Sequence, residues 1–226
     1  MQLESDFSYT CEKWQCSWIR QPFNAWSSLI FLAVGLMLVF EAKAETTLKV
    51  NPSRHRKLAI AGFLFLIGLS SFMSHASEIW FFGYFDFMFQ IGFLGFIAAI
   101  RCRTRWGKSL LFFEIAAATL CLMISWRVSS PILYFFAAQA IVLELYSWRF
   151  ARPFADSEKN HKYLFMGVGV CLIGLPLFAL DRSGTICAPQ NHLLQLHGLW
   201  HICAALGIYL LAQYFAREIE PCRRSI

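Results

Sequence analysis

Residues 192–215 read HLLQLHGLWHICAALGIYLLAQYF, a stretch without a single Asp, Glu, Lys or Arg. A helix needs about 20 mostly apolar residues to cross the hydrocarbon core of a bilayer. This stretch is long enough for one crossing, yet it carries three histidines, His192, His197 and His201. It therefore predicts a membrane-spanning helix with ionisable side chains on it.

Six further apolar stretches of similar length precede this one. Hydrophobic residues make up 58% of the 226-residue chain, above the roughly 45–50% of ordinary soluble domains. We therefore predict an all-α integral membrane protein, a bundle of seven transmembrane helices that forms a single domain over residues 1–226. Its expected parts are an N-terminal cap at 1–23 and spans near 24–42, 58–77, 84–100, 109–126, 131–148, 163–180 and 192–215.

The basic residues predict the orientation of the bundle, because Lys and Arg near the ends of spans are retained on the cytoplasmic side. Sixteen of the 20 Lys and Arg residues fall in the loops after the first, third and fifth spans and in the C-terminal tail. The other side holds the remaining four, Lys13, Arg20, Arg127 and Arg182. We therefore expect the N-terminus outside the cell or in a lumen, and the C-terminus in the cytoplasm.

The same bias accounts for the formal net charge of +6. Basic loops beside a membrane are typically solvated and lie near anionic lipid headgroups, and the sequence contains no nucleic-acid-binding motif, so we expect no nucleic-acid partner. Residues 1–23 are polar, acidic and aromatic, without the basic start and apolar run of a cleavable signal peptide. We expect them to be retained as an exposed cap.

Three of the eight cysteines, Cys11, Cys16 and Cys187, fall on the predicted outer side, where disulfides persist. We expect one disulfide there, and the pair that we favour is Cys11 with Cys187, which would pin the cap to the loop before the last span. The other five cysteines lie in spans or on the cytoplasmic side, where a free buried thiol packs as a small hydrophobic group.

Ionisable side chains inside the predicted spans are the main functional signal. They are His75 and Asp86, eleven residues apart, and His197 with His201. Such a residue at membrane depth costs roughly 2.5–3.5 kcal/mol on insertion scales. Each histidine taken alone could simply join a hydrogen-bond network between helices. However, all four residues fall in the outer half of the membrane, and residues four apart on a helix share a face, so one shared site is favoured.

A metal ion is the partner that suits this set of residues. Three neutral imidazoles leave a fourth tetrahedral position for water, which is the layout of a catalytic zinc site. Zinc makes such a water easier to deprotonate and polarises a substrate carbonyl. Asp86 would then serve as general base toward the water and as acid toward a leaving amine. Ser71, one turn before His75, would donate a hydrogen bond to the carbonyl oxygen as charge develops there.

These residues together resemble the alkaline ceramidase family, within the wider superfamily of seven-span metal hydrolases that includes the adiponectin receptors. Three motifs match: Ser71-x-x-x-His75 in the second span, Asp86 in the third, and His197-x-x-x-His201 in the last. The family's tail pattern W-H-x-x-x-x-L-G-x-Y is reproduced by Trp200, His201, Leu206, Gly207 and Tyr209. Near the N-terminus, Cys11-Glu12 and Pro22-Phe23-Asn24 are also similar, so the likeness covers almost the whole chain.

The resemblance implies zinc ligation by His75, His197 and His201. It also implies hydrolysis of the amide that links a fatty acid to a sphingoid base, with a membrane lipid, ceramide or a related N-acyl lipid, as substrate. The pairing of Cys11 with Cys187 follows the family arrangement as well.

One departure from the family concerns calcium, which animal alkaline ceramidases bind through acidic and polar groups of the N-terminal segment. In this chain Tyr9 and Thr10 precede Cys11, Trp14 replaces an expected amide, and Gln21 stands in place of a second Glu. Glu12 alone is retained as a weak calcium candidate. Because calcium sites depend on oxygen ligands and on their charge, we do not expect calcium regulation.

Two other functions fit the same histidines. One is a non-enzymatic receptor or signalling protein that resembles the adiponectin receptors or the haemolysin III group, and the other is a carrier of metal or haem. The charge bias is the same for a bacterial inner membrane as for an endoplasmic reticulum or Golgi membrane, so both fit. No oligomeric state is predicted.

Overall fold

A computed structural model of the protein describes residues 10–44, 52–77, 79–101, 105–124, 132, 135–139, 141–142 and 157–217. All regular secondary structure in these residues is helical. The long helices are α1 (Pro22–Ala44), α2 (Pro52–Ser77), α3 (Trp80–Arg101), α4 (Arg105–Ile124), α6 (Ser157–Ser183) and α7 (Leu196–Arg217). The all-helical class is therefore as predicted.

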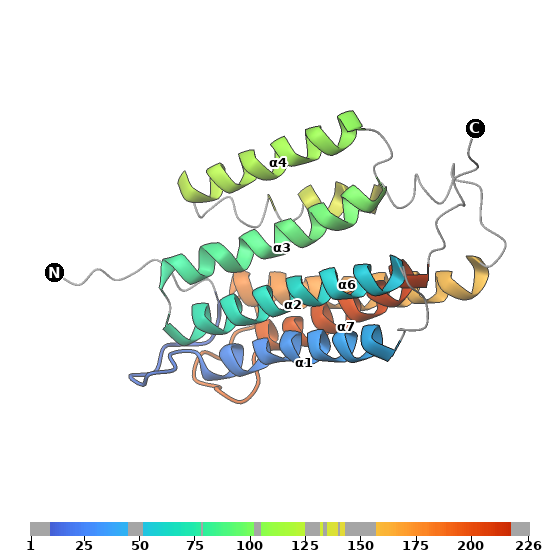
Figure 1. Ribbon diagram of the computed structural model, residues 1–226. Helices are drawn as coiled ribbons and strands as arrows, with labels where there is room; N and C mark the ends of the chain where they lie inside the picture. The colour runs from blue at the N-terminus through green and yellow to red at the C-terminus, as the bar shows by residue number, and fades with distance from the viewer. Residues whose placement is uncertain are drawn as a thin grey trace, which may run out of the picture.

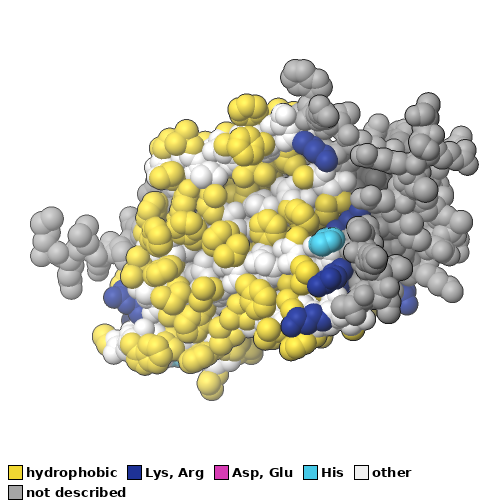
Figure 2. All heavy atoms as spheres, viewed as in Figure 1, with side chains coloured by type: hydrophobic (Ala, Val, Ile, Leu, Met, Phe, Trp, Pro, Cys, Tyr) yellow, Lys and Arg dark blue, Asp and Glu magenta, His cyan; other side chains and the backbone are white. Residues whose placement is uncertain are grey.

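Within the described residues, six helices are long and apolar enough to cross a membrane. Figure 2 shows hydrophobic side chains over most of the visible face, with Lys and Arg side chains toward its two ends. Phe112 and Phe113 of α4 are 69% and 68% exposed, and apolar side chains exposed over a wide face mark a surface that meets lipid or a partner. The protein is a multi-pass integral membrane protein, as predicted.

The predicted span near 131–148 lies mostly outside the described residues. Within it, residues 132, 135–139 and 141–142 are described, and they are helical. The total of seven spans and the side on which each terminus lies stay predictions.

The helices that carry the predicted site pack around one another. Helix α7 packs against α1, α2 and α6, and α2 also packs against α1 and α3. Figure 1 shows α1, α2, α6 and α7 side by side, with α3 and then α4 beyond them. Leu38 of α1, Leu64 of α2 and Ala205 of α7 are fully buried in the core between these helices.

A glycine allows a close approach between α7 and α1. A Cβ atom on Gly198, the residue after His197, would overlap the Phe23 ring and lie 2.9 Å from Ser27 Oγ. Small residues at such contacts let membrane helices pack with their backbones close together. Gly198 therefore brings the histidine-bearing start of α7 against the start of α1.

A short segment without helix, residues 10–21, lies at the end of the bundle where α2 ends and α3 begins (Figure 1). We call this segment the cap. The predicted disulfide between Cys11 and Cys187 is confirmed, with an S–S distance of 2.06 Å, and it joins the cap to the connection between α6 and α7. Two cap amides also donate to the last carbonyls of α2, Arg20 N to Ala76 O at 3.0 Å and Gln21 N to His75 O at 3.1 Å.

Helix α7 begins at Leu196, four residues after the predicted start of its span near residue 192. The delay has a local cause, because the Asn191 side chain accepts hydrogen bonds from the backbone N–H groups of Leu193 and Leu194 at 3.0 and 3.1 Å. This side-chain turn competes with helix formation. Gln195 then accepts the first helical bond, from Leu199 N at 3.1 Å.

Candidate metal centre

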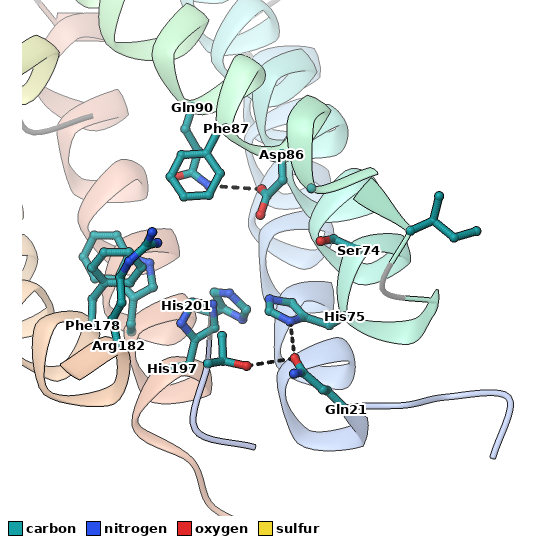
Figure 3. Close-up of a pocket in the computed structure, with 14 residues that line it drawn as sticks. Gln21, Ser74, His75, Asp86, Phe87, Gln90, Phe178, Arg182, His197 and His201 are labelled. Carbon is teal, nitrogen blue, oxygen red and sulfur yellow. Dashed lines mark hydrogen bonds between the residues drawn. The ribbon is translucent and has the colours of Figure 1, made fainter. Parts of the chain in front are cut away.

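The three predicted histidine ligands lie together. His75 is in the last turn of α2, and His197 and His201 face the same way from the first turns of α7. The centres of their rings are 4.7–5.4 Å apart, and one nitrogen of each lies within 4.8 Å of the others. All three are buried. Figure 3 shows the rings turned toward one another, and the group could hold a metal ion.

Oxygen acceptors fix the orientation of two of the rings. His75 Nδ1 is 2.7 Å from Gln21 Oε1, and the Gln21 amide is oriented because its Nε2 donates to Glu12 O at 3.1 Å. His201 Nδ1 is 2.9 Å from Ser27 Oγ, whose hydroxyl donates to Asn24 O at 3.0 Å. Both oxygens are thus placed to accept a hydrogen bond from Nδ1–H, which leaves Nε2 of each ring as the ligand nitrogen.

The third ring has a carboxylate beside it. His197 Nδ1 lies 3.7 Å from Asp181 Oδ2, somewhat beyond the range of about 2.7–3.2 Å for an N–H···O hydrogen bond. Asp181 Oδ2 also accepts the backbone N–H of Cys11 at 3.2 Å. Within the described residues, His197 Nδ1 is a buried polar atom without a hydrogen-bond partner.

The donor set therefore fits a metal ion. Metal-bound histidines almost always donate their outer N–H to a carboxylate, a carbonyl or water, which fixes the ring and its tautomer. Here the outer nitrogens of His75, His201 and His197 face an amide oxygen, a hydroxyl and a carboxylate. Three buried imidazoles of this kind suit zinc and other first-row ions that prefer nitrogen ligands.

The predicted aspartate lines the same cavity as the histidines. Asp86 lies near the start of α3 and is 7% exposed, and its Oδ1 accepts a hydrogen bond from Gln90 Nε2 at 3.0 Å. Figure 3 shows Asp86 across the cavity from His197 and His201. The other described lining residues are Thr10, Gln21, Ser74, Ile79, Gly83, Phe87, Gln90, Phe178, Arg182 and Trp200.

Ser71 lies behind this lining. It is 1% exposed, and its Oγ is 3.1 Å from Ser28 Oγ. Ser74, rather than Ser71, is among the described residues that line the cavity. The catalytic role of Ser71 stays a prediction.

Glu12 has a structural task in the described structure. Its carboxylate accepts the backbone N–H groups of Phe23 and Asn24, at 3.0 and 2.9 Å, and so caps the start of α1. Its Oε1 is also 3.1 Å from His192 Nδ1. A carboxylate suits a helix N-terminus because the first N–H groups lack helical partners and carry partial positive charge. Calcium binding at Glu12 stays a weak prediction.

Several residues around the centre were not assigned a role from the sequence. In the sequence, Gln21 stands out only as a departure from the family. No motif in the sequence assigns Asp181, Gln90 or Arg182 to the site. Gln90 had a readable signal, because it lies four residues after Asp86 and so on the same helix face. The adjacent charges Asp181 and Arg182 at the end of an apolar stretch were a second signal.

Comparison with known proteins agrees with this geometry. No curated protein matches the chain. A protein-family model described as Ceramidase matches residues 9–219, nearly the whole chain, and the match includes the cap, His75, Asp86 and both histidines of α7. Membership of this family implies a hydrolase that acts on amide bonds and a lipid substrate. The chain belongs to the ceramidase family.

Proposed function

We propose that the protein is a zinc-dependent amide hydrolase that cleaves ceramide, or a related N-acyl lipid, into a fatty acid and a sphingoid base or amine. The observation that carries the proposal is a cavity in which three buried imidazoles from two helices face one another beside a buried aspartate. The family match supplies the class of bond.

The residues have distinct proposed roles. His75, His197 and His201 would hold the ion through one nitrogen each. The chemistry that zinc supplies when bound is Lewis acidity, which polarises a carbonyl and makes a water easier to deprotonate. Asp86 would take a proton from the attacking water and pass it to the leaving amine nitrogen. Because Gln90 occupies Oδ1, Oδ2 is the atom proposed to carry this proton.

Ser71 is proposed to donate a hydrogen bond to the substrate carbonyl oxygen as charge develops there. From its described position beside Ser28 Oγ, its side chain would need to turn toward the cavity.

The substrate is proposed to enter from the bilayer. Ile79, between α2 and α3, lines the cavity and is 53% exposed, so the cavity reaches the surface of the bundle there. Trp80 and Phe81, the next two residues, are 38% and 52% exposed. Aromatic side chains are enriched at membrane interfaces. We propose that the acyl chain lies among the helices and that the amide lies near the outer leaflet, with the N-terminus outside or in a lumen.

The experiment is to measure free fatty acid released from a panel of N-acyl lipids, with purified protein and one equivalent of zinc in detergent. Turnover by the wild type should fall to background in His201→Ala. The control is His55→Ala, which changes an exposed histidine and should keep full activity. If zinc binds stoichiometrically but no N-acyl lipid is cleaved, the hydrolase proposal fails and a receptor is favoured. If zinc is lost during purification, a carrier is favoured.

A further inference from the structure

We infer that the disulfide-anchored cap is a working part of the metal centre, and that Gln21 and the backbone amide of Cys11 are positioning groups for His75 and His197. The inference rests on the metal-binding half of the proposed function and not on the cleavage of an amide. Nothing in the sequence suggested it, because the cap was expected to be an exposed segment.

Gln21 holds His75 at two points. Its side-chain Oε1 is 2.7 Å from His75 Nδ1, and its backbone N–H donates to His75 O at 3.1 Å. The ring and the backbone of one ligand are therefore both held by a single residue of the cap. Gln21 is only 2% exposed, so water does not compete freely for these bonds.

Other cap residues hold Gln21 in turn. Thr10 Oγ1 donates to Gln21 Oε1 at 3.0 Å, and Gln21 Nε2 donates to Glu12 O at 3.1 Å. Because the amide nitrogen is engaged by Glu12, the oxygen must point to His75. The orientation of the ring thus depends on the fold of residues 10–12, which lie beside the disulfide.

The same end of the cap reaches the second ligand. The backbone N–H of Cys11 donates to Asp181 Oδ2 at 3.2 Å, and this oxygen lies 3.7 Å from His197 Nδ1. Asp181 is buried, and buried polar groups are normally hydrogen-bonded. The Cys11 amide supplies such a bond, so it sets where the carboxylate sits beside His197.

The third ligand depends on the cap indirectly. Glu12 caps the start of α1 through the N–H groups of Phe23 and Asn24, and Asn24 O holds the Ser27 hydroxyl that faces His201 Nδ1. All three outer nitrogens therefore face acceptors that the cap positions. The disulfide from Cys11 to Cys187 and the bond from Lys13 N to Pro189 O at 2.9 Å fasten the cap to the connection before α7.

This arrangement gives the disulfide a role in metal retention. When the Cys11–Cys187 bond is open, the cap is held by hydrogen bonds alone and the acceptors for His75 and His197 are free to move. Loss of such outer partners typically lowers metal affinity by about 10- to 100-fold. Zinc should therefore bind more weakly and leave faster when the disulfide is absent.

The first test measures the zinc dissociation constant of the full-length protein in detergent by competition with a chelator. Gln21→Leu should weaken zinc binding about 10- to 100-fold, while Gln21→Glu, which keeps an oxygen acceptor for His75 Nδ1 but loses the donor to Glu12 O, should weaken it less than Gln21→Leu does. Gln15→Leu is the matched control, because the described contact of Gln15 is made by its backbone. The inference is overturned if Gln21→Leu binds zinc as tightly as the wild type, or if Gln21→Glu is as weak as Gln21→Leu.

The second test addresses the disulfide. The double variant Cys11→Ser/Cys187→Ser should release zinc to the chelator faster than the wild type, and Cys16→Ser, which changes an exposed free cysteine, should not. Wild-type protein whose disulfide has been reduced with a phosphine should release zinc as fast as the double variant does. This measurement replaces the double variant if that variant fails to fold. Equal release rates with and without the disulfide would overturn the inference. If zinc binding depends on Gln21 and on the disulfide but the wild type cleaves no amide, the proposed function is refuted and the inference about the cap stands.

Discussion

Two polar clusters join α1, α2 and α7, one at each end of these helices. At the end away from the cap, the Glu41 carboxylate of α1 accepts hydrogen bonds from Lys57 Nζ at 2.9 Å, Tyr209 OH at 2.7 Å and Gln213 Nε2 at 2.6 Å. At the cap end, His75 of α2 meets His197 and His201 of α7. The same three helices thus carry both clusters, and the clusters differ in how their charges and protons are balanced.

The Glu41 cluster contains its own counter-charge. One carboxylate meets one ammonium and two neutral donors, so the chain itself completes the cluster. In the histidine cluster, the hydrogen-bond acceptors Gln21 and Ser27 lie around the group of rings and face Nδ1 of His75 and His201. One nitrogen of each of the three rings lies close to the other two. A neutral imidazole that donates from one ring nitrogen keeps a lone pair on the other, which can bind a metal ion. The histidine cluster could therefore hold a metal ion, whereas the chain's own charges complete the Glu41 cluster, which we call the structural clamp.

The largest expected effect comes from the two carboxylates. Asp86→Asn should lower the rate of fatty acid release by about 10²- to 10⁴-fold, because the proton-transfer group is lost, and it should leave zinc binding in place. Glu41→Gln should leave the rate nearly unchanged, since Glu41 lies in the other cluster. Rates measured at saturating lipid, together with zinc content, separate the two variants. Equal losses of rate in both would show that the clusters are not functionally distinct.

The sequence was most informative where an ionisable residue lies in an apolar stretch, because such a residue costs free energy on insertion into a membrane. His75, His197 and His201 were predictable as one site because ionisable side chains in apolar stretches need a partner, and because the four-residue spacing on a helix fixes which way a pair points. The disulfide was predictable because few cysteines fall on the outer side. These inferences need only composition, spacing and approximate depth.

The outer partners of the histidines could not be predicted in the same way. Gln21 and Asp181 lie at the ends of spans, where polar residues cost little and so attract no notice. Their tasks arise from contacts over long sequence distances, such as the bond from Cys11 N to Asp181 across 170 residues. The use of Glu12 to cap α1 likewise requires the cap to fold back on the helix, which no local pattern shows.

Removal of zinc should have the second-largest effect, a loss of stability that depends on the histidine cluster and not on the Glu41 cluster. A ligand present at about 100 to 1,000 times its dissociation constant stabilises the folded state by about 2.7 to 4.1 kcal/mol. The unfolding temperature of the purified protein should therefore drop when a chelator is added and recover with zinc. Glu41→Gln should show the same drop, whereas His201→Ala should show none. A zinc response that disappears in Glu41→Gln would contradict the separation of the two clusters.

A smaller effect is expected from the ammonium of the Glu41 cluster. Lys57 is 5% exposed, but the Glu41 side chain is 31% exposed, so solvent partly screens the pair. Lys57→Met should lower the free energy of unfolding by about 1–2 kcal/mol without changing the zinc dissociation constant. Lys162→Met, at a lysine that lies over the Tyr163 ring and is exposed, is the control. Weaker zinc binding in Lys57→Met would mean that the clamp also shapes the metal centre.

The smallest expected effect on zinc affinity comes from a change at Ser27. Its size tests whether one hydrogen-bond acceptor of His201 can replace the other. Ser27 Oγ is 2.9 Å from His201 Nδ1, and Ser28 Oγ is 3.4 Å from the same nitrogen. Ser27→Ala leaves Ser28 as a substitute acceptor after a small movement of the ring. Zinc affinity should therefore fall by less than the factor of about 10 that is expected when a metal-binding histidine loses its sole hydrogen-bond acceptor.

The double variant Ser27→Ala/Ser28→Ala removes both hydroxyls and should reach that factor. Chelator competition on the two single variants and the double variant measures the coupling directly, since substitution of one acceptor for another makes the double loss larger than the sum of the single losses. Strictly additive losses would show that His201 uses only one of the two hydroxyls. Because neither serine belongs to the Glu41 cluster, the unfolding temperature of the metal-free protein reports separately on any loss of helix packing.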